Sequence, residues 1–213
     1  MKYSVIIVAN GIGSRMNLGY NKAYLKLDDD RTILRHSMDL FMNDEECKEI
    51  IVVTSADDFY ASWNEFWSGN ILIARGGKTR QESVYNGLFV AREDYVLVHD
   101  AARPYLELED LEALKEALKN NDGAVLCVPC KDTIKKVSAT YIEETYKREE
   151  LYQAQTPQGF KRILLLECFN KAIEDNYVGT DDSSLVEKYS NTKVKLVVGS
   201  YNNIKITTEE DLR

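Results

Sequence analysis

The sequence predicts an α/β fold in which a mostly parallel sheet is covered by helices on both faces. Short apolar segments alternate along the chain with longer amphipathic segments, and such alternation is typical of parallel strands connected by helices. Most of the short segments are apolar at every position, as expected of strands that are buried on both faces. Ligands of such sheets bind at the carboxyl ends of the strands, so residues that follow a strand are the first candidates for a functional site.

The predicted elements follow one another regularly over the first part of the chain. Apolar segments predict strands at residues 4–9, 49–54, 71–74, 95–99, 123–128 and 193–198. Apolar residues at helical spacing predict helices at about residues 33–43, 57–67, 80–92 and 109–120. These elements are enough for a single α/β domain, and we assign it to residues 1–213.

The regular alternation stops after residue 128. Residues 131–152 are polar and contain two strand-like stretches, Thr133-Ile-Lys-Lys-Val137 and Tyr141-Ile-Glu-Glu-Thr145, with a turn between them. An excursion of this kind is often an arm that packs on a partner, whereas other long irregular segments are flexible loops. We therefore expect either a β-arm or a surface loop.

The charge and hydropathy of the chain exclude several classes of function. The formal net charge of -8 argues against a broad nucleic-acid surface, because such domains are usually basic. No apolar segment has the length of a membrane span, and the N-terminus shows no signal-peptide pattern. We expect a cytoplasmic protein without a nucleic-acid or membrane partner, in which any anion site concentrates its cations locally.

Two of the four cysteines, Cys127 and Cys130, have the spacing of a redox pair. A redox pair normally lies where a strand leads into a helix N-terminus, which lowers the thiol pKa. Here the pair ends an apolar strand and polar residues follow, so we expect ordinary thiols and keep a thiol redox protein as an alternative. A zinc site would need more ligands, and the two histidines show no zinc-ligand spacing.

The first predicted strand leads directly into a glycine loop, Asn10-Gly-Ile-Gly-Ser-Arg-Met16, and Lys22 follows shortly afterwards. Glycines allow close approach of the backbone to a ligand, and the N–H groups of such a loop form an anion site. Arg15 adds a planar fork for phosphate oxygens and Lys22 adds a point charge. The loop is neither a P-loop nor a three-glycine dinucleotide motif. It predicts a phosphate site, with a purely structural turn as the alternative.

Two other segments also follow predicted strands. Gly76-Gly-Lys-Thr-Arg-Gln-Glu-Ser-Val84 opens a helix, whose N-terminal N–H groups attract anions. Within it, Thr79 and Glu82 fit a capping box, and Ser83 adds a hydroxyl. Asp100 and Arg103 follow the next strand and either bind hydroxyls and phosphate or form a salt-bridged turn.

Several segments after the arm carry polar residues in short patterns. Gln155-Thr-Pro-Gln158 is predicted to be a polar turn. Gly179-Thr-Asp-Asp182 is predicted to begin a helix with Thr180 near the N-cap. Asn203-Ile-Lys-Ile-Thr207 places Lys205 in a strand-like stretch, and the last residues of the chain look like the start of a helix.

Taken together, these segments resemble 2-C-methyl-D-erythritol 4-phosphate cytidylyltransferases, enzymes of non-mevalonate isoprenoid biosynthesis, over essentially the whole chain. The motifs that carry the resemblance are Val8-Ala-Asn-Gly-Ile-Gly-Ser-Arg-Met16, Asn21-Lys22, Gly76-Gly-Lys-Thr-Arg-Gln-Glu-Ser-Val84, Val98-His-Asp-Ala-Ala-Arg-Pro104, Asp132-Thr-Ile-Lys135, Gln155-Thr-Pro-Gln158, Gly179-Thr-Asp-Asp182 and Asn203-Ile-Lys-Ile-Thr207. The resemblance implies a Rossmann-like fold of the nucleotide-diphospho-sugar transferase type, with a protruding β-arm at about residues 131–152 that is used for dimerisation.

The resemblance also implies a reaction. CTP and 2-C-methyl-D-erythritol 4-phosphate would give the CDP-alcohol and pyrophosphate, with Mg²⁺ bound mainly through the CTP phosphates. A phosphate oxygen of the polyol would attack the α-phosphorus in line, so no covalent nucleophile is needed. The chain would have to offset the repulsion of two anions and stabilise charge in the transition state.

Site residues are implied by the matching motifs. Arg15 and Lys22 would hold the triphosphate and Lys205 the α-phosphate. The cytidine pocket would be lined by Ala9, Asn10, Gly11, Gly77 and Ser83. The second substrate would be bound by Asp100, Arg103 and Thr180, together with Thr133 and Arg148 from the arm of a neighbouring protomer, which implies a homodimer. The motifs identify no metal ligands.

The chain departs from the family pattern at two places. Asn10 stands where alanine is common, and it adds an amide near the base. Asn21-Lys22-Ala23 replaces the common Pro-Lys-Gln, which keeps the lysine but loses the proline that would stiffen its loop.

Besides the thiol redox protein, two functional alternatives remain at this stage. A ribitol-5-phosphate cytidylyltransferase shares the fold and the chemistry, but the Asp100-Ala-Ala-Arg103 and Thr180-Asp-Asp182 segments favour methylerythritol phosphate. A non-catalytic nucleotide-binding module is the other alternative, and it is disfavoured because the expected cations are present.

Overall fold

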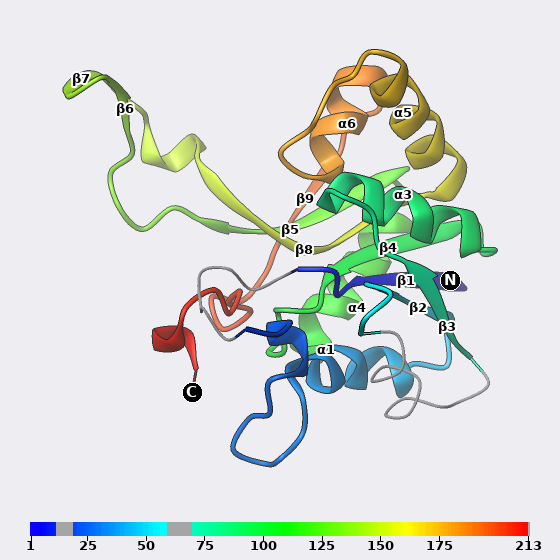
Figure 1. Ribbon diagram of the computed structural model, residues 1–213. Coiled ribbons are helices and arrows are strands. Elements are labelled where there is room, and N and C mark those ends of the chain that lie inside the picture. Colours follow the sequence, from blue (N-terminus) through cyan, green and yellow to red (C-terminus); the bar gives the residue numbers. More distant parts are fainter. Residues whose placement is uncertain (12–18, 59–69, 213) are drawn as a thin grey trace.

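The central sheet is mostly parallel, with one antiparallel strand. The computed structural model describes residues 1–11, 19–58 and 70–212, and in these parts of the chain seven strands form one sheet in the order β3-β2-β1-β4-β8-β5-β9 (Figure 1). The strands are β1 (Tyr3–Val8), β2 (Cys47–Thr54), β3 (Ile71–Arg75), β4 (Tyr95–Asp100), β5 (Gly123–Pro129), β8 (Tyr152–Lys161) and β9 (Lys195–Val198). Only β8 runs antiparallel to its neighbours among these strands. The predicted fold class is confirmed.

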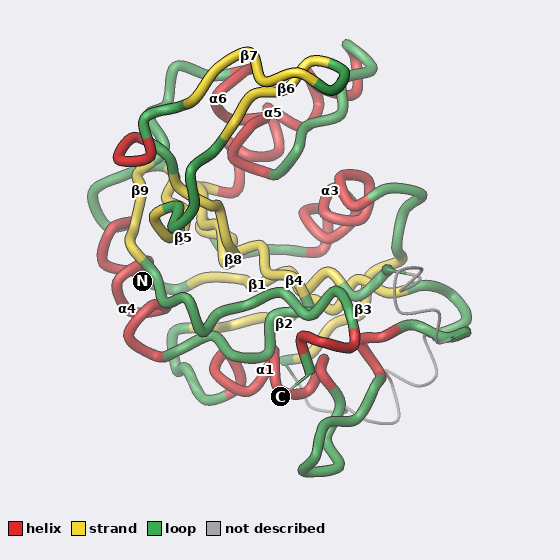
Figure 2. Tube along the Cα trace, turned by 90° about the vertical axis from the view of Figure 1, so that its left-hand side faces the viewer, coloured by secondary structure: helices red, strands yellow, loops and turns green. Residues whose placement is uncertain are grey.

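Helices cover both faces of this sheet (Figure 2). The described helices are α1 (Ile33–Met42), α3 (Arg80–Val90), α4 (Leu108–Leu118), α5 (Arg162–Glu174) and α6 (Asp182–Tyr189). One buried cluster joins α1 and α4 to the sheet, and a second cluster joins α3, α5 and α6 to the opposite face. The apolar segments that predicted the strands are therefore buried from two sides.

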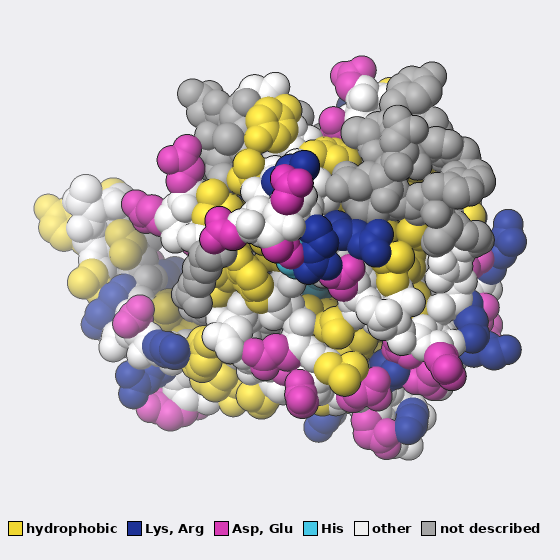
Figure 3. All heavy atoms as spheres, turned by 90° about the horizontal axis from the view of Figure 1, so that it is seen from below, with side chains coloured by type: hydrophobic (Ala, Val, Ile, Leu, Met, Phe, Trp, Pro, Cys, Tyr) yellow, Lys and Arg dark blue, Asp and Glu magenta, His cyan; other side chains and the backbone are white. Residues whose placement is uncertain are grey.

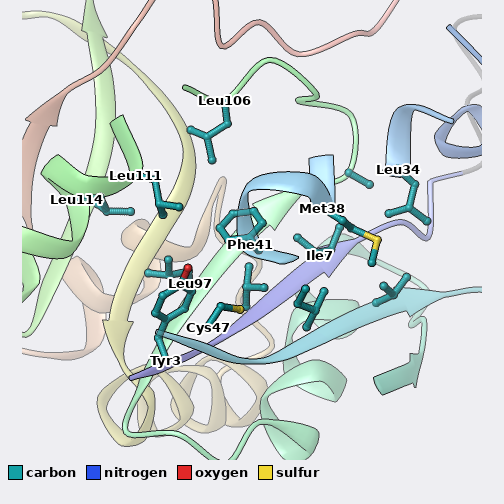
Figure 4. Close-up of a cluster of buried hydrophobic side chains, with 14 of the residues drawn as sticks. Tyr3, Ile7, Leu34, Met38, Phe41, Cys47, Leu97, Leu106, Leu111 and Leu114 are labelled. Carbon is teal, nitrogen blue, oxygen red and sulfur yellow. The ribbon is translucent and has the colours of Figure 1, made fainter. Parts of the chain in front are cut away.

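Strand β1 shows why most of its residues are apolar. Val5 and Ile7 belong to the cluster on the α1 side, whereas Ile6 belongs to the cluster on the α3 side, and all are fully buried. Figure 4 shows Ile7 beneath Met38 and Phe41 of α1. Because successive side chains of a strand point to opposite faces, Val5, Ile6 and Ile7 contribute alternately to the two cores.

The turn predicted at residues 155–158 is wrong, because these residues lie inside β8 and are buried. Residues 155–157 face an irregularity in the pairing of β5 with β8, between Val125 and Cys127. A proline is tolerated in a sheet at such a place, where no ladder hydrogen bond is needed from its nitrogen. The polar residues of β8 form hydrogen bonds inside the protein. Their sequence therefore resembles that of an exposed turn, although they lie in a central strand.

Three other regions differ from the predicted elements. Helix α5 has no predicted counterpart, although Leu165, Phe169 and Ala172 follow helical spacing and are buried. The segment at residues 203–207 forms no strand; it is fixed to the turn after β4 by a hydrogen bond from Ile206 N to Ala102 O. The helix predicted at residues 57–67 lies, apart from its first two residues, outside the described residues.

Short 3₁₀ helices occupy three of the remaining segments that the structure describes. They are η1 (Lys22–Tyr24), η2 (Arg148–Glu150) and η3 (Glu209–Asp211). The last of these corresponds to the helix start predicted at the end of the chain, where Thr208 and Asp211 form a capping box.

Residues between β5 and β8 leave the sheet as an extended segment (Figure 1). It carries β6 (Lys135–Ser138) and β7 (Tyr141–Thr145), which pair as an antiparallel hairpin with every residue exposed. The two strand-like stretches predicted here are therefore strands, and the alternative of an irregular loop is wrong.

The outer surface beside α1 carries charges of both signs. Arg31 pairs with Asp29 and Asp39, and Arg35 pairs with Asp39. Figure 3 views the molecule from the side on which α1 lies in Figure 1, and it shows cationic and acidic side chains interspersed. No described helix combines the length and the apolar character that crossing a membrane would require.

Candidate functional site

A cavity of about 780 Å³ lies at the carboxyl ends of the parallel strands. Its walls come from the segments that follow β1, β2, β3 and β4, together with the C-terminal segment that contains Lys205 and Thr207. After β1 the chain adds β2 and β3 on one side, and it then returns to add β4 on the other side. The cavity therefore lies at the switch point of the sheet, where ligands of α/β proteins bind.

One wall of the cavity is a network of uncharged groups between the β1 loop and the start of α3. Asn10 Nδ2 donates to Gly77 O at 2.6 Å and to Ser83 Oγ at 3.3 Å. Ser83 Oγ also accepts from Gly77 N at 3.0 Å and donates to Thr79 O at 2.8 Å. Three of the predicted nucleotide-binding residues thus form one hydrogen-bonded unit, and Ala9 and Gly11 lie beside it in the cavity wall.

The start of α3 follows the predicted cap with one change. Thr79 is the N-cap and accepts from Glu82 N at 3.0 Å. The Glu82 carboxylate accepts from Lys78 N, one residue before the cap, so the reciprocal bond of a capping box is displaced by one residue. The side chains of Thr79 and Glu82 therefore accept hydrogen bonds from backbone N–H groups at the N-terminus of α3.

Lys22 lies on the opposite wall, in η1. Its Nζ donates to Ile206 O at 2.5 Å, which places the Lys22 ammonium beside the segment that carries Lys205. The preceding Asn21 is buried; it accepts from Ala23 N at 3.0 Å and donates to Ala9 O at 2.5 Å. The amide of Asn21 therefore fixes this loop to the end of β1, so the loop is held in place without the proline of the family pattern.

A buried ion network joins four segments beside the cavity. Asp100, at the end of β4, accepts from Arg80 Nε at 3.1 Å and from Lys205 Nζ at 2.6 Å. The two other guanidinium nitrogens of Arg80 donate to Asp182 at 3.1 and 2.9 Å. Burial alone would raise the pKa of Asp100, but Arg80 and Lys205 hold that pKa well below its usual range. Asp100 is therefore an ionised acceptor.

Arg103 does not take part in this ion network and does not line the cavity. Its Nη1 donates to Asn203 O at 2.6 Å, while its Nε is buried and has no hydrogen-bond partner among the described residues. The alternative of a salt-bridged turn between Asp100 and Arg103 is therefore wrong among the described contacts, because Asp100 pairs with Arg80 and Lys205.

The backbone of this turn is held by a buried histidine. His99 Nε2 lies 3.1 Å from Arg103 O, and since a carbonyl only accepts, Nε2 carries the proton. His99 Nδ1 then accepts from the Thr156 hydroxyl, whose oxygen accepts from Asp100 N at 3.0 Å. Burial lowers the pKa of His99 to about 4, so the ring is neutral near pH 7.

The remaining predicted site residues are separate from the cavity. Thr180 is exposed and directly precedes Asp181, the N-cap of α6, so the predicted helix start near Thr180 is confirmed. Thr133 and Arg148 are exposed on the segment between β5 and β8, and Arg148 Nη1 donates to Lys131 O. Arg15 lies outside the described residues.

Arg80 and Asp182 were not predicted as site residues. Both occur within motifs that the sequence analysis identified, and Arg80 opens a helix directly after a strand. A cation at that position is a signal that could have identified Arg80. Nothing in the sequence indicates that Asp182 would be its partner.

Among the described residues, the cysteines form no reactive thiol site and the acidic side chains form no metal site. Burial raises the pKa of Cys127 to about 11, which is the reverse of what a reactive thiolate needs. All four cysteines are free. The described residues contain no group of three or more His, Cys, Asp or Glu side chains placed to hold a metal ion.

Comparison with known proteins identifies relatives of the whole chain. The family model for 2-C-methyl-D-erythritol 4-phosphate cytidylyltransferase matches residues 3–213. A protein of that name from Clostridioides difficile strain 630 is 43% identical over 99% of this chain and 90% of its own length. Another from Geobacillus thermodenitrificans is 40% identical over 100% of this chain and 94% of its own.

Solved structures give the same result. The 4-diphosphocytidyl-2C-methyl-D-erythritol synthase of Anaerococcus prevotii superposes with a TM-score of 0.88 at 33% identity, covering 99% of this chain and 94% of that one. The 2-C-methyl-D-erythritol 4-phosphate cytidylyltransferase of Francisella tularensis superposes with a TM-score of 0.87 at 32% identity, covering 100% and 97%.

The neutral state of His99 predicts a pH dependence of stability. The unfolded chain takes up a proton on this histidine near pH 6.5, whereas the folded protein does so only near the lowered pKa of about 4. Stability is therefore lost as the pH falls from 6.5 to 4, by up to about 3 kcal/mol. Urea titrations across this range should show a shallower decline for His99→Gln, and equal slopes for the two proteins would contradict the assignment.

Removal of Arg80 should destabilise the protein strongly. Arg80→Ala leaves Asp100 and Asp182 buried without their shared partner, and breaking a buried pair costs about 3–5 kcal/mol. Arg92→Ala is the matched control, because Arg92 is 81% exposed and lies 3.7 Å from Glu49, an arrangement that contributes at most about 1 kcal/mol. Similar unfolding midpoints for the two variants would show that the network does not stabilise the fold.

Proposed function

The chain belongs to the 2-C-methyl-D-erythritol 4-phosphate cytidylyltransferase family, and we propose that its cavity is where CMP is transferred from CTP to the polyol phosphate. A phosphate oxygen of 2-C-methyl-D-erythritol 4-phosphate attacks the α-phosphorus of CTP, the bond from that phosphorus to the bridging oxygen breaks, and pyrophosphate leaves. The observation that carries this proposal is the convergence of Lys22 and Lys205 on one cavity at the switch point of the sheet.

Lys22 and Lys205 are the proposed phosphate-binding residues. Both lysines line the cavity, and the bond from Lys22 Nζ to Ile206 O places Lys22 beside the segment that carries Lys205. Both substrates are anions, so fixed cations are needed before the reacting atoms can meet. Charge that builds up on the transferred group and on pyrophosphate is then stabilised by cations already in place. By its motif, Arg15 joins Lys22 in holding the triphosphate.

The uncharged wall and the ion network suit different parts of the substrates. Asn10, Gly77 and Ser83 offer hydrogen bonds without charge, as a pyrimidine requires. Asp100 is an ionised acceptor that lines the cavity, and it suits the hydroxyl groups of the polyol. Neither Arg103 nor Thr180 is among the described residues that line the cavity, and we assign both to the polyol phosphate on their motifs alone.

Mg²⁺ is proposed as the cofactor, bound mainly through the CTP phosphates. Magnesium usually takes one or two carboxylates, substrate phosphates and several waters, rather than a cage of protein ligands. Three carboxylates, Asp57, Asp58 and Asp100, line the cavity, so the donors present fit an ion of this kind. When bound, it would neutralise phosphate charge during the transfer.

We propose that a second copy of the chain is the partner of the extended segment. The β6–β7 hairpin exposes Val137, Tyr141 and Ile142, and Tyr141 is 79% exposed. An isolated two-stranded hairpin with apolar side chains in water is only marginally stable. Thr133 and Arg148 belong to this segment and line no part of the cavity in their own chain, which fits residues that complete the neighbour's site.

A cytoplasmic location is proposed on the state of the thiols. The four cysteines are free, and three of them are buried. Proteins of reducing compartments keep their thiols unpaired.

Pyrophosphate release tests the reaction and the role of Lys22 together. With CTP and Mg²⁺, the wild-type protein should release pyrophosphate with 2-C-methyl-D-erythritol 4-phosphate and not with ribitol 5-phosphate. Lys22→Ala should lower the rate by about 10²-fold or more, because a charge-assisted contact in the transition state is lost. Lys26→Ala is the matched control, since Lys26 is exposed and pairs with Asp30. Turnover with ribitol 5-phosphate alone would overturn the substrate assignment and leave the cation assignment standing.

Subunit mixing tests whether the site is shared. If Arg148 acts in the neighbour's site, each mixed dimer of Lys22→Ala and Arg148→Ala subunits has one intact site. Random exchange should then restore about a quarter of the wild-type activity. A mixture of Lys22→Ala and Lys205→Ala subunits should restore none, because each of its sites keeps a defect. Mixed dimers without restored activity in the first mixture would place Arg148 outside the partner's site.

A further inference from the structure

The peptide that links Ile206 to Thr207 is held on both sides. Its carbonyl oxygen, Ile206 O, accepts from Lys22 Nζ at 2.5 Å. Its N–H group, Thr207 N, donates to Asp211 Oδ2 at 2.7 Å. The peptide is trans, so its C=O and N–H groups lie in one plane and point in opposite directions. Whatever orients the N–H group therefore also orients the carbonyl that holds the Lys22 ammonium.

Asp211 holds this N–H group as one of four bonds to the same carboxylate oxygen. Its Oδ2 also accepts from Thr207 Oγ1 at 2.8 Å, from Thr208 N at 2.9 Å and from Thr208 Oγ1 at 3.2 Å. Hydrogen bonds from the two backbone N–H groups, together with those from the hydroxyls, lower the pKa of Asp211 to about 2. The carboxylate is therefore ionised near pH 7, and an ionised acceptor forms stronger hydrogen bonds than a neutral one.

The residue before this peptide is fixed independently of Asp211. The Ile206 side chain is fully buried and packs with Ile33, and Ile206 N donates to Ala102 O at 2.8 Å. The freedom left beyond Ile206 is rotation of the following peptide plane, which would turn its carbonyl away from Lys22. The bond from Thr207 N to Asp211 opposes that rotation. A charged acceptor at the N–H group also polarises the peptide, which strengthens the hydrogen bond at its carbonyl.

The charge of Asp211 alone would have the opposite effect on an anionic ligand. Thr207, which is bonded to Asp211, lines the same cavity as Lys22 and Lys205, whereas Asp211 does not line it. A carboxylate close to a phosphate site repels the phosphate, so its removal should strengthen binding if charge were its only influence. A positioning role and a purely electrostatic role therefore predict changes of opposite sign in the KM for CTP.

We propose that Asp211 is a positioning residue that acts through the Ile206–Thr207 peptide to place the Lys22 ammonium for the triphosphate. The inference rests on the proposed function, in which Lys22 binds the triphosphate of CTP. Asp211 touches no substrate in this role. It limits the freedom that Lys22 would otherwise lose when the nucleotide binds, and such preorganisation favours binding.

A double-mutant cycle with Lys22 tests this role. Asp211→Ala should lower kcat/KM for CTP by about tenfold, less than the loss for Lys22→Ala, because the ammonium is kept but less well placed. The KM for CTP should rise, while the KM for the polyol phosphate should stay within about twofold. In the Lys22→Ala protein the same change should lower kcat/KM by less than about twofold, since the group that Asp211 positions is gone. Equal factors in both backgrounds would overturn the inference.

Control variants separate the positioning role from charge and from stability. Asp211→Asn keeps an oxygen that can accept from Thr207 N, so it should retain more activity than Asp211→Ala. Glu210→Ala removes the same charge from an exposed position in η3, and it should change kcat/KM for CTP by less than about twofold, because exposed charges are screened. Circular dichroism confirms that each variant is folded.

Two further outcomes would also decide against the inference. A lower KM for CTP in Asp211→Ala would show that the charge of Asp211 outweighs any positioning of Lys22. If the wild-type protein released no pyrophosphate from CTP, the proposed function itself would fail and the inference with it.

Discussion

The architecture of the site depends on the neutralisation of one buried carboxylate. Asp100 ends β4 at the switch point of the sheet, where an unpaired charge would be costly to bury. Arg80 and Lys205 supply the compensating charges, and the planar fork of Arg80 also holds Asp182. This one network therefore fixes the start of α3, the start of α6 and the C-terminal segment around the end of β4. Because Asp182 pairs only with Arg80 among these groups, removal of Arg80 would leave the buried Asp182 unpaired, whereas removal of Lys205 would leave Asp100 with Arg80.

Neutral groups hold the backbone beneath this network. The neutral ring of His99 joins Arg103 O to the Thr156 hydroxyl, and that hydroxyl accepts from Asp100 N. A charged histidine would add a third cation behind Asp100, whereas the neutral ring orients the turn without changing its charge. The cavity wall combines cations, among them Lys22, Arg80 and Lys205, with the uncharged groups around Asn10.

Sequence patterns predicted the elements that depend on neighbouring residues. They failed for elements and contacts that depend on residues distant in the sequence. The strands were predictable because burial on two faces requires continuous apolar residues, and the place of Asn10 and Asp100 in the cavity wall was predictable because they follow predicted strands. Strand β8 was not, because Gln155 and Gln158 are buried polar residues whose partners, Ser200 and Asp181, come from later segments. The pairing of Arg80 with Asp182 has the same cause, since it joins two helices that only the folded sheet brings together. The roles proposed for Thr133 and Arg148 would depend on a second chain, which a single chain does not contain.

The two departures from the family pattern have a common physical effect. Asn21 joins the η1 loop to Ala9 O, and Asn10 joins the β1 loop to Gly77 O, so each amide crosses between segments that line the cavity. Walls fixed in this way lose little further freedom when a ligand binds, and such preorganisation favours binding. The cations are arranged differently, because Lys22 is bonded to a carbonyl and Lys205 to Asp100 before any phosphate arrives. A phosphate oxygen would therefore replace or share an existing acceptor, and in taking Lys205 it would leave Arg80 as the charge that keeps Asp100 ionised for the second substrate.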